Sequence, residues 1–177
     1  MAFSYLQKST LSLAMVPAPA SPEGACCSRV IVAGGGRDLV WPHQLIAAEL
    51  LCRSDGRPVH LLLHGGARGA DQAIARADQQ LGWSAVSLPA EWGRHGRAAG
   101  PIRNRQLLEQ AIACALAQGT PGFPVSVLVV AFPGGAGTAS LVQEARRLAS
   151  RSPVPIAVAE VSPSAGLWSV PVGVGRS

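Results

Sequence analysis

Short apolar runs that end in glycine-rich turns constrain the fold of this chain more than any other feature. Three such turns occur, at residues 34–38 (GGGRD), 64–71 (HGGARGAD) and 133–138 (PGGAGT), and each directly follows a run rich in valine, leucine or isoleucine. Glycine has no Cβ, so it lets the backbone turn sharply and approach other atoms closely. A repeated unit of strand, glycine turn and helix therefore predicts an α/β fold.

The same alternation continues along the chain. Apolar runs predict five strands, and segments with apolar residues at helical spacing predict the helices between them. The predicted strands are 29–33, 59–63, 84–88, 125–132 and 154–158, and the predicted helices are 41–53, 70–81, 102–117 and 138–150. Right-handed crossovers place helices on both faces of a sheet, so we expect a three-layer, Rossmann-like fold with a mainly parallel sheet of five or more strands.

If the order is Rossmann-like, strands three, two, one, four and five lie side by side. In that order the direction of winding reverses between the first and fourth strands, which opens a crevice at their carboxyl ends. Turns 34–38 and 133–138 follow these two strands, and turn 64–71 follows the strand beside them. Topology and composition therefore predict the same ligand site.

The 177 residues suit one domain, expected over 29–161. We expect a disordered leader over 1–28 and a flexible tail over 162–177. The leader weakly imitates a signal peptide, which leaves export as the alternative to the expected cytoplasmic location. No apolar run approaches the roughly 20 residues of a membrane span.

Charge and cysteine content narrow the ligand class. The net charge is +5, and fourteen of the fifteen basic residues are arginine. Arginine grips phosphate in two places, so the bias fits anionic ligands or nucleic acid, although a GC-rich genome would give the same composition. The four cysteines form no CxxC pair, and no His or carboxylate cluster has ligand spacing, so we expect no disulfide framework, no metal and no bound cofactor.

Each turn offers candidate site residues. The Thr138 hydroxyl can cap the next helix or contact a phosphate. Asp71 can stabilise the first turn of a helix or contact a ligand. Arg37 and Asp38 can pair with each other or contact a ligand. Arg103 opens a helix, where positive charge opposes the macrodipole unless an anion lies nearby. The polar stretch 89–99 is predicted to be a flexible lid. The full set of predicted ligand-binding residues is Gly34, Gly35, Gly36, Arg37, Asp38, His64, Gly65, Gly66, Ala67, Arg68, Asp71, Arg103, Asn104, Pro133, Gly134, Gly135, Ala136, Gly137 and Thr138.

Five ordered blocks, GGGRD, HGGARGAD, PAEW, AGPIRNRQLL and VVAFPGGAGTA, resemble the YspA/YpsA-related branch of the SLOG superfamily over roughly residues 30–158. That superfamily includes "lonely guy" phosphoribohydrolases, the DNA-processing protein DprA, and sensor domains thought to bind nucleotides or NAD-derived signals. The resemblance implies a homodimer. It also implies that Arg103 occupies the position of a functional arginine in the phosphoribohydrolases. A phosphate would then be held by Gly65, Gly66, Gly134, Gly135, Gly137 and Thr138.

One departure from the resemblance concerns catalysis. The phosphoribohydrolases follow their PGGxGT motif with a glutamate, whereas Ala139, Ser140 and Leu141 follow Thr138 here. Serine cannot stabilise a developing positive charge as a carboxylate does.

Three functions remain open. The first is a binding module for a nucleotide or an ADP-ribose-like or NAD-like ligand. The second is a hydrolase of nucleotide N-glycosidic bonds with Arg103, Asp38 and Asp71 as catalytic residues, Glu91 being a further candidate carboxylate. The third is single-stranded DNA binding, for which the chain lacks clustered aromatic residues.

Overall fold

The computed structural model describes residues 28–164 and contains a single five-stranded parallel sheet. Its strand order is β3-β2-β1-β4-β5, as predicted. The strands are β1 (Ser28–Gly34), β2 (Val59–His64), β3 (Ala85–Ser87), β4 (Val125–Ala131) and β5 (Ile156–Glu160). The helices are α1 (His43–Ser54), α2 (Ala70–Leu81), α3 (Trp92–His95), the 3-10 turn η1 (Gly96–Ala98), α4 (Ala99–Gln118) and α5 (Ala136–Ala149).

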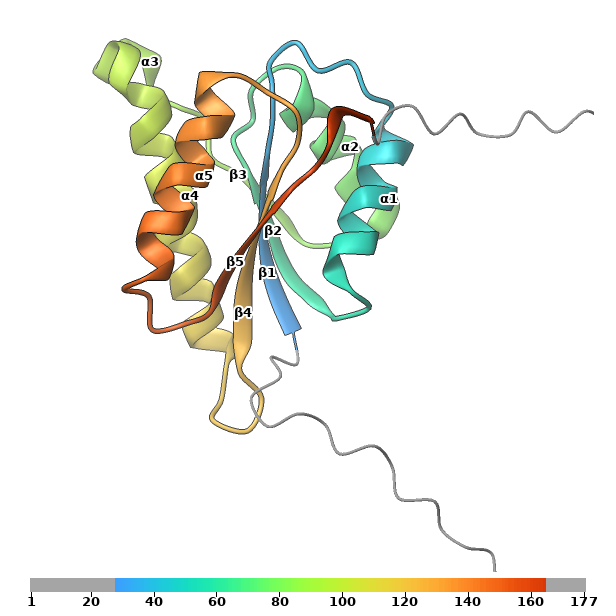
Figure 1. Cartoon of the computed structure of the whole chain (residues 1–177), viewed down its shortest axis with the longest axis vertical. Helices are drawn as coiled ribbons and strands as arrows, with labels where there is room; N and C mark the ends of the chain where they lie inside the picture. Colours follow the sequence, from blue (N-terminus) through green and yellow to red (C-terminus); the bar gives the residue numbers. More distant parts are fainter. Residues whose placement is uncertain (1–27, 165–177) are drawn as a thin grey trace, which may run out of the picture.

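Two pairs of helices cover the two faces of the sheet (Figure 1), which confirms the three-layer Rossmann-like fold. Helices α1 and α2 pack on one face around Ile31, Ile46 and Ile74, and α4 and α5 pack on the other around Val30 and Leu108. Every residue of β4 is buried, because this strand lies between β1 and β5 with helices on both sides. Such continuous apolar strands are typical of parallel sheets.

The largest difference from prediction lies in residues 89–99. This stretch is not a polar loop: it forms α3 and η1, and α4 starts at Ala99, three residues before the predicted helix start. Pro101 fits inside the first turn of α4 because the backbone N–H that proline lacks has no partner there. Residues 92–98, which form α3 and η1 and are here called the helical arm, lead directly into α4 at the carboxyl end of the sheet (Figure 1).

Other boundaries shift by a few residues, mostly beside prolines. β5 begins at Ile156 and not at Val154, since Pro155 has no N–H for the ladder and only its carbonyl accepts a bond, from Val127. α1 begins after Pro42, two residues later than predicted. Ser28, assigned to the leader, opens β1. The rest of the predicted leader and residues 165–177 of the predicted tail lie outside the described residues. Within 28–164, no helix combines the length and apolar character that crossing a membrane requires.

Candidate functional site

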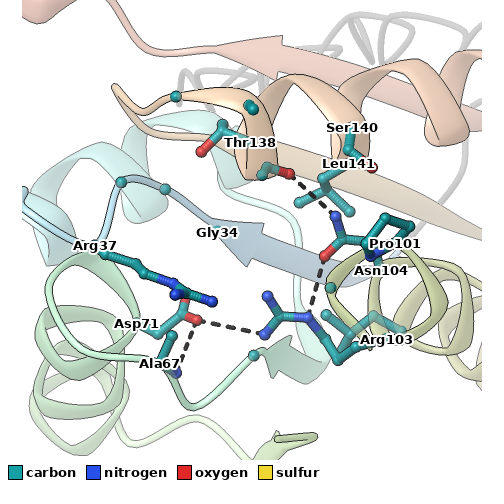
Figure 2. A pocket seen from close by; sticks show the side chains of 18 of the residues that line it. Gly34, Arg37, Ala67, Asp71, Pro101, Arg103, Asn104, Thr138, Ser140 and Leu141 are labelled. Carbon is teal, nitrogen blue, oxygen red and sulfur yellow. Dashed lines mark hydrogen bonds and ion pairs between the residues drawn. The ribbon is translucent and has the colours of Figure 1, made fainter. Parts of the chain in front are cut away.

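A cavity of about 460 Å³ opens at the carboxyl ends of β1 and β4, where the strand order predicts a crevice. Its wall comes from the three glycine-rich turns and the first two turns of α4 (Figure 2). The predicted ligand-binding residues that line it are Gly34, Gly35, Gly36, Arg37, Asp38, Gly65, Ala67, Asp71, Arg103, Asn104, Gly135, Ala136, Gly137 and Thr138. Those that do not line it are His64, Gly66, Arg68, Pro133 and Gly134.

A chain of polar contacts crosses this cavity and fixes Arg103 (Figure 2). The Arg103 Nη1 lies 3.6 Å from Asp71 Oδ2, and its Nε donates to Asn104 Oδ1 at 3.1 Å. Asn104 Nδ2 in turn donates to the Gly137 carbonyl in the first turn of α5 at 3.1 Å, and Asp71 accepts from the Ala67 N–H at 3.1 Å. Arg103 therefore ties α4 to Asp71 in the first turn of α2, and Asn104 ties α4 to the first turn of α5.

Burial dominates the electrostatics of this pair. It raises the pKa of Asp71, while the Ala67 N–H and the charge of Arg103 act in the opposite direction. Burial also lowers the pKa of Arg103, which Asp71 opposes and the charge of Arg37 reinforces. Because Arg37 and Arg103 point into the same cavity, their mutual repulsion favours a bound anion there (Figure 2).

Gly65 provides the seat for the Arg103 side chain. A Cβ at this position would overlap Nη1 and Cζ of Arg103 and lie 2.8 Å from Nη2. Gly65 is buried and has an ordinary φ, so only the guanidinium, and not a strained backbone, requires glycine. The phosphate contact that the resemblance implies for Gly65 stays a prediction; in the structure its bare Cα packs against Arg103 at the edge of the cavity.

Close contacts between loops account for further glycines. A Cβ on Gly36 would lie 3.0 Å from the Pro133 carbonyl, and one on Gly134 would lie 2.6 Å from the Gly36 amide. These glycines let the turns after β1 and β4 pass each other, and the Gly36 N–H donates to the Pro133 carbonyl at 2.9 Å.

Gly135 and Gly137 differ from these because a Cβ on either would meet no atom within 4 Å. Both line the cavity at the start of α5, where the first N–H groups of a helix have no partner inside it. Thr138 does not cap α5; its buried hydroxyl lies against Gly134 and has no hydrogen-bond partner among the described residues. Open backbone at a helix start is suited to an anion.

The other charged candidates are distributed over the rim. Asp38 does not pair with Arg37: its carboxylate is 92 % exposed and lies 3.5 Å from Arg68. Arg68 does not line the cavity but a second groove, which shares Arg37 and Asp38 with it. The Arg37 guanidinium instead lies over the Trp92 ring, 4.6 Å from its centroid. Trp92 and Arg97 of the helical arm also line the cavity, and neither was among the predicted site residues.

His64 stabilises the loop after β2 through a hydrogen bond. Its side chain is buried and Nδ1 accepts the Gly66 N–H at 3.2 Å, in a turn where Gly66 has φ +64°. Burial lowers the pKa of His64, which favours the neutral ring that this acceptor role needs. His64 therefore holds the shape of the loop that carries Ala67 and Asp71.

The carboxylates that line the cavity are Asp38 and Asp71, whereas Glu91 and Glu144 lie outside it. Ser140 and Leu141, which stand where the resemblance would place a glutamate, face the cavity (Figure 2). Within residues 28–164, no three His, Cys, Asp or Glu side chains gather in a way that could hold a metal ion.

Comparison of this chain with protein-family models, with curated proteins and with solved structures gave no match.

Proposed function

We propose that this protein binds a nucleotide or a nucleotide-derived molecule such as ADP-ribose, with its phosphate between Arg103 and the start of α5. One observation carries the proposal: the fixed Arg103 guanidinium and the open backbone at Gly135 and Gly137 line a single cavity. Asn104 contacts both Arg103 and Gly137, so the two phosphate-binding elements have a fixed separation. Helix starts and arginine forks are the groups proteins use for phosphate.

The charge balance of the cavity supports an anionic ligand. Three arginines line it, namely Arg37, Arg97 and Arg103. Among the described residues, Asp71 pairs with Arg103, but no carboxylate lies within ion-pair distance of Arg37 or Arg97. The volume of about 460 Å³ falls within the range of small-molecule sites.

Binding without turnover is the form of the proposal that we favour. Cleavage of an N-glycosidic bond needs a carboxylate free to act at the sugar, and Asp71 is already engaged by Ala67 and Arg103. Asp38 lies at the exposed rim beside Arg68. Hydrolysis remains the second candidate function, because Asp38 and Asp71 both line the cavity. An assay for released base distinguishes hydrolysis from binding alone.

Calorimetric titration of the full chain with AMP, ADP-ribose and NAD tests the proposal, with chromatography of each mixture for released base. We expect binding without product, and affinity reduced about 10- to 100-fold by Arg103→Gln. Arg105→Gln is the matched control: Arg105 lies on the same helix, outside the cavity, and pairs with Glu109 at 2.8 Å. Absence of binding by all three molecules contradicts the proposal, and product that disappears in Asp71→Asn supports the hydrolase.

The remaining expectations concern setting and partners. A homodimer, a cytoplasmic location and the less favoured binding of single-stranded DNA stay predictions from the sequence. Titration with a fluorescent oligonucleotide at low salt tests the last of these, since phosphate contacts weaken steeply as salt rises.

A further inference from the structure

Trp92 occupies an unusual place at the mouth of the cavity. It is the first residue of α3, it is 46 % exposed, and it lines the cavity. Large aromatic side chains at a cavity edge combine an apolar face for a ligand with access from solvent. A core role does not account for this side chain, because Trp92 belongs to neither of the two hydrophobic clusters.

Two neighbours hold the indole where it is. The Arg37 guanidinium lies over the ring at 4.6 Å from the centroid, and a Cβ on Gly100 would lie 3.4 Å from the ring atom Cη2. The side chain therefore bridges the turn after β1 and the start of α4. Both neighbours line the same cavity.

The contact between Arg37 and Trp92 is one that a ligand can replace. An exposed cation-π contact is weaker than a charge-assisted hydrogen bond to phosphate, and an aromatic base stacks well on an indole. Arg37 has no carboxylate partner among residues 28–164, so its charge is available to an anion.

We propose that Trp92 is the platform on which the aromatic base of the ligand stacks, and that Arg37 moves from the indole to the ligand's phosphate. This inference rests on the proposed function and restricts the range of ligands that the site accepts. The site is then selective for a phosphate ester that carries a base, and a sugar phosphate without a base binds less well. Trp92 sets that selectivity while Arg103 and the start of α5 hold the phosphate.

AMP and ribose 5-phosphate form a matched pair of probes, because they share the sugar and the 5′-phosphate and differ in the adenine. Both are titrated into the wild type, Trp92→Ala, Trp92→Phe and Arg37→Gln, with thermal unfolding of each variant to verify its fold. We expect Trp92→Ala to weaken AMP about 5- to 100-fold and leave ribose 5-phosphate unchanged. Trp92→Phe keeps an aromatic face and should lie close to wild type, whereas Arg37→Gln should weaken both probes.

Tryptophan fluorescence gives an independent measurement. AMP should quench the tryptophan emission of the wild type but not that of Trp92→Phe. Trp83→Phe is the matched control: it removes a partly buried tryptophan that packs against the core, so AMP should still quench its emission. If Trp92→Ala leaves AMP affinity unchanged, or weakens both probes equally, the platform role is wrong while ribose 5-phosphate binding by the wild type still supports the phosphate site. If neither probe binds the wild type, this inference fails, and the proposed function fails with it only if ADP-ribose and NAD do not bind either.

Discussion

Replacing Gly65 by alanine tests the seating of Arg103 without removing its charge. The added Cβ would overlap Nη1 and Cζ of Arg103, so the guanidinium must move by about 2 Å to reach an ordinary separation. The backbone can remain as it is, since Gly65 does not have a positive φ. In the wild type, Arg103 Nη1 lies 3.6 Å from Asp71 Oδ2. The displaced guanidinium loses this ion pair, and its hydrogen bond to Asn104 is no longer aligned.

The structure sets the size of the effect. The side chains of Arg103 and Asp71 are 15 % and 5 % exposed, so the variant leaves a buried carboxylate whose remaining bond comes from Ala67. We expect the free energy of unfolding to fall by about 2 kcal/mol at neutral pH. The folded-state pKa of Asp71 is already raised, and losing Arg103 raises it further. An ionised Asp71 opposes folding, so the penalty is full above that pKa and shrinks as the pH falls through it and Asp71 takes up a proton.

Urea unfolding at a series of pH values from neutral down toward 3.8, the ordinary pKa of Asp71, together with AMP titration at neutral pH, measures both consequences. Gly122→Ala is the matched control, because Gly122 has no atom within 4 Å of a Cβ and no positive φ. We expect AMP affinity to fall about 10- to 100-fold in Gly65→Ala and to be unchanged in the control. A Gly65→Ala protein with wild-type stability and affinity would refute the description of the site, and a penalty that does not change with pH would contradict the role of Asp71.

Three further substitutions separate the contributions of the site. Gly137→Ala should leave the unfolding free energy within about 0.5 kcal/mol of wild type, because its Cβ meets no atom, yet weaken AMP in calorimetry if the ligand lies on this backbone. Asn104→Ala should cost about 1–3 kcal/mol in urea unfolding, since the Gly137 carbonyl and the Arg103 Nε both lose their bond to the Asn104 side chain. Burial lowers the pKa of His64 from 6.5, so below about pH 6.5 the unfolded chain binds the proton first and the folded state loses stability. His64→Gln should flatten that loss between about pH 8 and about pH 5, and parallel curves would count against it.

The strand order could be predicted because it follows from a few strong physical constraints. The apolar run that became β4 is buried along its whole length, and right-handed crossovers leave few arrangements for five such strands. Exact boundaries depend on single hydrogen bonds. Pro155 illustrates this: it lies inside the predicted fifth strand, yet its carbonyl bonds to Val127 while the ladder starts one residue later.

The helical arm at residues 92–98 could not be predicted from periodicity. Gly93 and Gly96 disfavour a helix, and the stretch has no apolar stripe to bury. Contacts distant in sequence accompany its conformation: Trp92 lies under the Arg37 guanidinium and against Gly100. A tryptophan within a polar stretch was the signal that the sequence offered for a site residue, and it could be interpreted only once these partners were known.

The glycine-rich turns show why a motif alone overstates the number of ligand contacts. Gly36 and Gly134 meet backbone atoms where two loops cross, so these two positions would demand glycine even in a chain that binds nothing, and Gly65 is needed to seat the Arg103 side chain. At Gly135 and Gly137 the described chain offers no such reason, and a side chain there would extend into open space beside the cavity. Glycine at those two positions is explained if a ligand approaches the backbone closely. Substitutions at 135 and 137 therefore test ligand binding directly, whereas a substitution at 36, 65 or 134 also tests whether the loops can form.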